Sequence, residues 1–139
     1  MADFFGIQSP FLDLCGIRAV TREPGRVVAE VEVREGHGNS FGIVHGGLTM
    51  TLLDAALGAA ARFSDPDASS VVTVDLHVSF VGPARGRLVG EGRLVRRAGR
   101  IVFCEGEVRG ESGEVAAKAL GIFKLRIGAG PADGAPGDG

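Results

Sequence analysis

The chain has 139 residues, with seventeen acidic and fifteen basic side chains and a formal net charge of −2. Its composition, 45% hydrophobic and 23% charged, is that of an ordinary globular protein, and the length suits one domain with its own core. The charge balance argues against a nucleic-acid-binding protein, whose contact face is usually strongly basic. The two cysteines, Cys15 and Cys104, lie far apart without a CxxC motif, which excludes a cysteine-rich zinc module and a disulfide framework.

The two ends of the chain differ in composition from the part between them. The N-terminal stretch MADFFGIQSP lacks the basic segment and apolar run of a secretory signal, so we expect a cytoplasmic protein. Residues 128–139 consist only of Gly, Ala, Pro and Asp, and such a segment buries too little apolar surface to become ordered. We therefore expect a single domain over residues 1–127 and a disordered tail over residues 128–139.

The first half of the chain contains one predicted strand and one predicted long helix. Residues 13–17 can begin a short helix, and Glu23-Pro24-Gly25 is typical of a turn. Alternation over residues 26–34 predicts a strand whose apolar face carries Val27, Ala29, Val31 and Val33. The glycine-rich stretch 35–42 is a loop that leads to the helix.

The long helix is predicted from about Gly46 to Phe63. Its residues 48–61 are nearly all apolar, but this run is shorter than the roughly 18 residues of a membrane span and contains Asp54. Because a helix without a polar face is usually buried on all sides, we expect the rest of the fold to enclose it.

The second half of the chain is predicted to be β-structure. After a polar loop at residues 64–70, alternation predicts strands over residues 71–81, 85–97, 101–109 and 114–127. In the first of these, the residues expected to share one face are Val72, Val74, Leu76, Val78 and Phe80. The short connections favour an antiparallel sheet. One apolar helix and about five strands predict an α+β fold in which a curved sheet wraps around the helix.

Apolar residues also fall on the expected outer face and edge of the sheet. Val28, Val71 and Val81 are examples. Such residues favour a homodimer, although isolated apolar side chains are also common on the surfaces of monomers.

Asp54 is the first candidate functional residue. Burial of an unpaired carboxylate costs several kcal/mol, and an apolar residue at this position would stabilise the helix. One explanation is structural: Asp54 reaches solvent through a gap or pairs with an arginine such as Arg62. The other explanation is chemical: Asp54 is a general base or nucleophile held where water is scarce.

The motif His45-Gly46-Gly47 lies at the N-terminus of the predicted helix. The first amides of a helix have no partner within it, so the Gly46 N–H could polarise a carbonyl oxygen as an oxyanion hole does. The two glycines could equally form only a tight turn. Nine residues separate His45 from Asp54, roughly 13 Å along a helix axis, so one chain can hardly place both on one carbonyl. This spacing favours a dimer with shared active sites.

Other candidates carry weaker signals. Thr73 lies on the more polar face of its strand, and the arginines around the Ala98-Gly99 turn could bind a phosphate or form a solvated hairpin tip. His37 and His77 are interpreted as ordinary loop and strand residues. Three scattered histidines predict no metal site, and the chain contains no GxSxG, P-loop or complete GxGxxG motif.

The pattern Asn39…Gly42…His45-Gly46-Gly47…Leu53-Asp54…Gly58 resembles the motif of hot-dog-fold acyl-CoA thioesterases. The branch it resembles is the phenylacetate-pathway (PaaI-like) type, which includes the 4-hydroxybenzoyl-CoA group, and the resemblance spans roughly residues 11–125. It implies a long helix wrapped by a five- to six-stranded antiparallel sheet. It also implies homodimers with active sites at the interface, often paired into tetramers, that hydrolyse an aryl- or medium-chain acyl-CoA. No cofactor is implied, because coenzyme A is part of the substrate.

The resemblance also implies roles for individual residues. Asp54 matches the carboxylate that attacks the thioester or activates water, and Gly46 matches the amide that polarises the carbonyl. Asn39 matches a residue that positions water or the thioester, from the subunit opposite to the one that supplies Asp54. His45 matches a residue that braces the loop, and Thr73 matches a hydroxyl near the carboxylate. The expected substrate-binding residues are Gly47, Phe41, Arg96, Arg97, Gly99 and Arg100.

Three alternatives to acyl-CoA hydrolysis remain open from the residues. The acyl group could arrive on an acyl-carrier protein instead of CoA. The chain could be a non-catalytic acyl-CoA-binding or sensor protein, although such a protein has little use for Asp54. A dehydratase or hydratase would use a histidine and an acid in a different motif, which the sequence does not contain.

Overall fold

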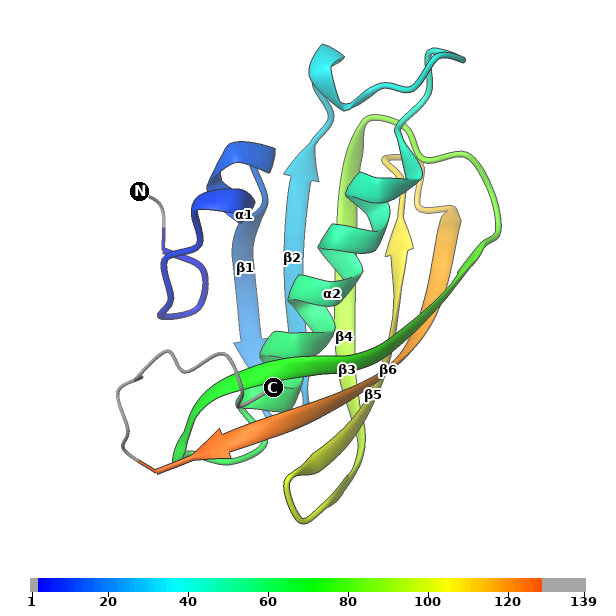
Figure 1. The fold of residues 1–139 in the computed structure, drawn as a ribbon. Helices are drawn as coiled ribbons and strands as arrows, with labels where there is room; N and C mark the ends of the chain where they lie inside the picture. Colours follow the sequence, from blue (N-terminus) through cyan, green and yellow to red (C-terminus); the bar gives the residue numbers. More distant parts are fainter. Residues whose placement is uncertain (1–2, 129–139) are drawn as a thin grey trace.

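The computed structural model describes residues 3–128 and contains a single antiparallel sheet curved around one long helix (Figure 1). The sheet has six strands in the order β1-β2-β4-β5-β6-β3, so β1 and β3 form its two edges. The helices are α1 (Pro10–Cys15) and α2 (Gly46–Arg62), with a 3-10 turn at Glu35–His37. The strands are β1 (Arg18–Glu23), β2 (Arg26–Glu32), β3 (Ala68–Phe80), β4 (Arg87–Ala98), β5 (Ile101–Arg109) and β6 (Val115–Ile127). This is the predicted hot-dog architecture.

Two N-terminal elements differ from the sequence prediction. Strand β1 was not predicted, because nearly all of its residues are exposed and it lacks apolar alternation. The short helix begins at Pro10 rather than Asp13, since the Ser9 side chain caps it by accepting the Leu12 N–H at 3.4 Å. It ends where Gly16 adopts a left-handed φ of 81°. The tail predicted over residues 128–139 lies, apart from Gly128, outside the described residues.

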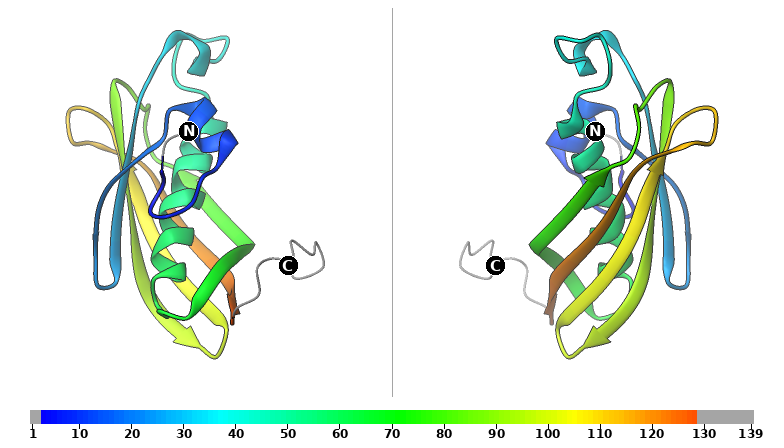
Figure 2. Two further views of the ribbon diagram at one scale, coloured as in Figure 1. Left: turned by 90° about the vertical axis from the view of Figure 1, so that its left-hand side faces the viewer. Right: turned by 90° about the vertical axis from the view of Figure 1, so that its right-hand side faces the viewer.

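Helix α2 lies in the concave face of the sheet, which curves around it (Figure 2). Its buried leucines, among them Leu52, Leu53 and Leu57, contribute to the hydrophobic core together with Phe123 of β6. The close approach depends on glycine in β4. A Cβ at Gly92 would lie 2.5 Å from the Ala56 carbonyl oxygen, a distance that no side chain tolerates. The absence of a side chain at this position therefore lets the helix rest directly on the sheet.

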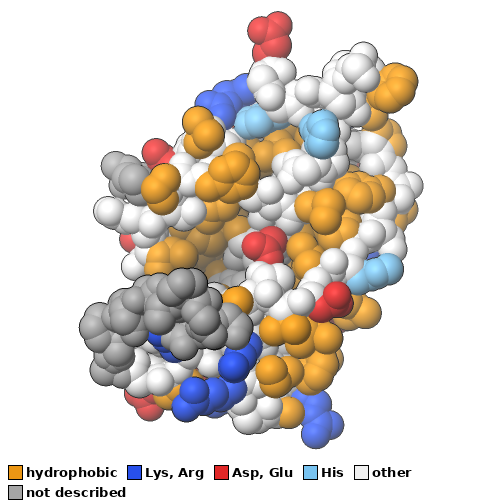
Figure 3. All heavy atoms as spheres, in the orientation of Figure 1, with side chains coloured by type: hydrophobic (Ala, Val, Ile, Leu, Met, Phe, Trp, Pro, Cys, Tyr) orange, Lys and Arg blue, Asp and Glu red, His pale blue; other side chains and the backbone are white. Residues whose placement is uncertain are grey.

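The expectation that α2 is enclosed on all sides is wrong for the single chain. Met50 is 39% exposed, and Thr51, Asp54 and Ala55 are only partly buried. The sheet covers one side of the helix and the N-terminal segment covers part of another. On the remaining face, apolar side chains surround a hollow (Figure 3). Although α2 has no polar face, it is therefore not buried on all sides.

Strand β3 contains a bulge that overturns its predicted alternation. Thr73 pairs with Phe123 and Asp75 pairs with Ile122, so Val74 is an extra residue and is 57% exposed. Val71 and Thr73 face α2 before the bulge, and Leu76 faces it afterwards. A bulge shifts the side-chain alternation by one residue, so Val74 and Leu76 cannot share a face. The bulge thereby places a hydroxyl and an apolar side chain on the same side of the strand.

Among residues 3–128, no helix is long and apolar enough to cross a membrane.

Candidate active site

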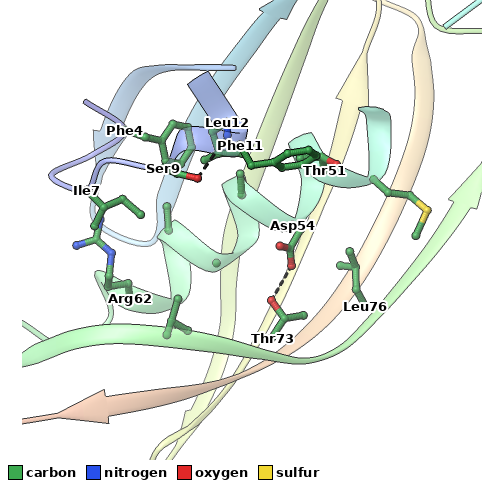
Figure 4. Close-up of a pocket in the computed structure, with 15 residues that line it drawn as sticks. Phe4, Ile7, Ser9, Phe11, Leu12, Thr51, Asp54, Arg62, Thr73 and Leu76 are labelled. Carbon is green, nitrogen blue, oxygen red and sulfur yellow. Dashed lines mark hydrogen bonds between the residues drawn. The ribbon is translucent and has the colours of Figure 1, made fainter. Parts of the chain in front are cut away.

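The carboxylate of Asp54 accepts a hydrogen bond from the Thr73 hydroxyl, with 2.7 Å between Oγ1 and Oδ1. Helix α2 supplies the carboxylate and the bulged strand β3 supplies the hydroxyl (Figure 4). Asp54 is half-buried and forms no ion pair within residues 3–128. The structural explanation in which Asp54 pairs with Arg62 is therefore wrong, since Arg62 instead donates to the Phe5 carbonyl.

Asp54 and Thr73 line a cavity of about 450 Å³ that is mostly apolar. Three parts of the chain form its walls: the N-terminal segment, α2 and β3 (Figure 4). The N-terminal segment contributes Phe4, Ile7, Ser9, Phe11 and Leu12. Helix α2 contributes Met50, Thr51, Asp54, Ala55, Gly58, Ala59 and Arg62, and strand β3 contributes Val71, Thr73 and Leu76.

The wall formed by the N-terminal segment was not predicted. The only sequence signal was that the first eleven residues are apolar without a helix or strand period. Of the apolar side chains in the first half of α2, Met50 lines the cavity, whereas Leu48 and Leu52 belong to the core.

The N-terminus of α2 is organised by His45. This residue is the N-cap, and its Nδ1 accepts the Gly47 N–H at 2.8 Å. The Gly46 N–H, in contrast, has no acceptor within the described part of the chain. A side chain at Gly46 would press against the Phe80 ring, 3.2 Å from its Cβ. Of the two glycine amides, only that of Gly46 is thus free to donate to a ligand.

Asn39 shapes the loop before the helix. Its side-chain oxygen accepts the N–H groups of Phe41 at 2.9 Å and Ile43 at 3.3 Å, while its own N–H donates to the Ile43 carbonyl at 2.8 Å. The amide nitrogen of the Asn39 side chain has no acceptor among residues 3–128 and is available as a donor to a ligand. Phe41 lies at the tip of this loop and is 84% exposed. The His37 carbonyl accepts the His45 N–H at 2.8 Å, so His37 braces the same loop.

The two halves of the predicted constellation lie apart in one chain. Asn39 and Gly46 line a second cavity, of about 430 Å³, together with Phe80 and the loop after β3. This cavity shares no lining residue with the cavity around Asp54. The separation agrees with the argument from helix spacing that one chain does not bring both groups to the same carbonyl.

The arginines at the β4–β5 hairpin do not converge on either cavity. Arg97 pairs with Asp65 at 2.8 Å and donates to the Gly99 carbonyl at 2.7 Å, so it ties the hairpin to the turn after α2. The Asp67 N–H and then Arg97 hold the pKa of Asp65 below its usual value. Arg96 lines a shallow apolar cavity beside Phe103 and Leu120, and Arg100 is exposed near the hairpin turn.

Other titratable groups suggest no further chemistry. Burial raises the pKa of the Cys104 thiol to about 12, which leaves it without thiolate character at neutral pH. Within residues 3–128, no three histidine, cysteine or acidic side chains gather as metal ligands.

Comparison with known proteins places this architecture in a family. The model of the thioesterase superfamily matches residues 41–117, more than half of the chain. This span contains Gly46, Asp54 and Thr73. The chain belongs to the thioesterase superfamily.

Some relatives of this thioesterase-superfamily protein match most of its length, and others match about half of it. A Pseudomonas aeruginosa protein with an esterase designation is 36% identical over 125 residues, which is 85% of this chain and 90% of that protein. Human acyl-coenzyme A thioesterase 13 is 38% identical over 69 residues, about half of each chain. A Bacillus halodurans protein, solved with CoA, has 30% sequence identity and a TM-score of 0.80, covering 88% of this chain and 82% of that one.

Proposed function

We propose that this protein hydrolyses acyl-CoA thioesters, with an aryl or medium-length acyl group, at sites formed between two copies of the chain. The observation that carries the proposal is Asp54, a carboxylate oriented by Thr73 in a largely apolar cavity. A carboxylate in such surroundings is well suited to act on a thioester, which needs neither a metal nor a Ser-His-Asp triad. The family and the CoA bound to the Bacillus halodurans protein support the same chemistry.

In the proposed mechanism, the thioester carbonyl lies between Asp54 of one subunit and Gly46 of the partner subunit. The free Gly46 N–H donates to the carbonyl oxygen and stabilises the negative charge that develops on it. His45 occupies the Gly47 amide and so fixes the helix terminus that presents Gly46. The amide nitrogen of Asn39 donates to the water or to the thioester.

Two routes through Asp54 lead to the same products. As a general base, Asp54 takes a proton from water while the water oxygen attacks the carbonyl carbon. As a nucleophile, it forms an anhydride with the acyl group, which water then cleaves. In both routes the C–S bond breaks and CoA leaves as the thiol. Asp54 is required in each case, and no cofactor takes part.

Strand β3 supports the proposed homodimer. It is a sheet edge of thirteen residues, and an exposed edge of this length offers unpaired backbone groups to a second strand. Phe80 and Val81, at and beyond its end, are 55% and 61% exposed. Pairing of two β3 strands would continue the sheet across both subunits. The proposed assembly is this dimer or a tetramer formed by two such dimers.

We propose that the remaining predicted residues contact the CoA part of the substrate. Arg96 and Arg100 carry positive charge without an ion pair among the described residues, so both are available to phosphate groups. Gly47, Gly99, Phe41 and Arg97 would shape the surfaces around them.

The decisive experiment compares thiol release from a panel of acyl-CoAs by the wild type and by Asp54→Asn. Asparagine keeps the size of the side chain and removes the basic, nucleophilic oxygen. We expect the wild type to be active and the variant to lose about a hundredfold or more in kcat, the range for acid–base catalysis. Equal activity of both proteins would show that Asp54 is structural. Binding of acyl-CoA without thiol release would favour a sensor, and activity only on acyl-carrier-protein thioesters would favour the carrier substrate.

A further inference from the structure

The cavity beside Asp54 extends along α2 as far as Arg62. Arg62 follows Asp54 by eight positions, which is about 12 Å along the helix axis. The helix residues that line the cavity between them are small, namely Ala55, Gly58 and Ala59. A chain-like group that starts at Asp54 can therefore lie along this face of the helix and end near Arg62.

Arg62 is half-buried at the end of this cavity without an ion pair among residues 3–128. Its guanidinium donates to the Phe5 carbonyl and lies 4.4 Å from the centre of the Phe63 ring. A guanidinium has five N–H donors, so most of them have no acceptor in the described part of the chain.

The charges around Arg62 leave a positive surplus. Arg22 lies against the same Phe63 ring at 3.5 Å, and the nearby carboxylate is that of Asp3. Burial, followed by the charge of Arg22, lowers the pKa of Arg62, and Asp3 offsets this only in part. Arg62 thus ends the cavity with one further cation and one carboxylate close behind it, outside the cavity lining. An anionic group on the ligand would balance the positive surplus.

We propose that the acyl group has a second carboxylate at its far end and that Arg62 binds this carboxylate. This inference rests on the proposed function, because it assigns the acyl group of the same site. The guanidinium fork matches a carboxylate in two parallel hydrogen bonds, whereas Phe4, Phe11 and Leu12 contact the methylene chain. Because the two positions lie about 12 Å apart along the helix axis, the substrate class is the CoA thioester of a medium-length straight-chain dicarboxylic acid.

The first test compares suberyl-CoA with octanoyl-CoA, which have the same number of acyl carbons and differ in the terminal group. For the wild type we expect a higher kcat/KM with suberyl-CoA. Arg62→Met, which retains an apolar side chain of similar length, should lower the suberyl/octanoyl ratio of kcat/KM at least tenfold. Arg62→Lys should retain part of the preference. The matched control Arg18→Met, which removes an exposed positive charge on β1 outside the cavity lining, should leave the ratio unchanged.

Three outcomes would overturn the inference. The wild type could prefer octanoyl-CoA, or Arg62→Met could slow both substrates equally, which would make Arg62 only a brace for the N-terminal segment. The third outcome concerns the source of the anion, since the CoA phosphates also suit a guanidinium. If the loss in Arg62→Met disappears with thioesters of dephospho-CoA, Arg62 binds the nucleotide and not the acyl carboxylate.

A binding measurement separates failure of this inference from failure of the proposed function. Absence of thiol release from both thioesters would contradict the proposed hydrolysis. Calorimetry with free suberate and octanoate would still test Arg62. Tighter binding of suberate by the wild type, lost in Arg62→Met, would support the inference, and equal binding of both acids would contradict it.

Discussion

At the scale of single residues, the hydroxyl of Thr73 determines how Asp54 is presented. It donates the one side-chain hydrogen bond that the Asp54 carboxylate receives within residues 3–128. Without this bond the carboxylate would be free to rotate about its side-chain torsions. Thr73 is therefore a positioning residue for the proposed reaction.

We expect Thr73→Val to lower kcat about tenfold with little change in KM, because binding of the acyl group does not involve the hydroxyl. The change in the free energy of unfolding should stay within about 1.5 kcal/mol, the usual net contribution of one hydrogen bond. Thr73→Ser keeps the hydroxyl and should retain most of the activity. Steady-state kinetics of both variants check this, and a valine variant as active as the wild type would refute the positioning role.

At the scale of elements, the contact between α2 and β4 depends on Gly92. A Cβ at this position would lie 2.5–2.9 Å from three backbone atoms of the helix, which cannot rotate away as a side chain could. We expect Gly92→Ala to destabilise the protein by about 1–3 kcal/mol, the usual cost of overpacking a core. Denaturation with urea measures this difference.

Gly36 provides the matched control for Gly92. It lies in the exposed 3-10 turn, and a Cβ there would meet no atom within 4 Å. Gly36→Ala should therefore change the stability by no more than about 0.5 kcal/mol, as surface substitutions usually do. If the two variants are equally stable, α2 can move away from the sheet at little cost and the close contact is not needed for folding.

At the scale of the whole molecule, the proposed site requires residues from two chains, and this can be tested by complementation. Asp54→Asn and Asn39→Ala alter residues in separate cavities. In a mixed dimer, one site would combine the intact Asp54 of one subunit with the intact Asn39 of the partner subunit. If both variants are nearly inactive alone, refolding them together should restore about a quarter of the wild-type activity, because half of the dimers are mixed and half of their sites are intact.

The outcome of the mixing experiment distinguishes shared sites from sites within one chain. With sites within one chain, every site in the mixture would carry one substitution, and the activity would not rise above that of the separate variants. Sedimentation of the mixture would show whether dimers had formed. Recovered activity together with a dimer would support the proposed assembly.

Local patterns in the sequence were enough for much of the fold. The alternation over residues 101–109 gives the bounds of β5, and the apolar run with its glycine pair locates the start of α2 at Gly46. Periodicity, capping and turn formation depend on residues only a few positions apart, so they can be read directly from the chain. The same locality made Asp54 conspicuous, since one carboxylate interrupts an otherwise apolar helix.

The tertiary structure decided what depends on contacts between distant segments. The bulge at Val74 arises from pairing of β3 with β6, and it brings Thr73 to Asp54 from nineteen positions away in the chain. The cavity wall from the N-terminal segment and the position of Arg62 at the cavity end depend on how separate elements pack. The sequence by itself therefore determined the type of fold and the candidate carboxylate. The strand register and the packing of the elements depend on contacts between residues far apart in the chain. These contacts decided which residues surround that carboxylate.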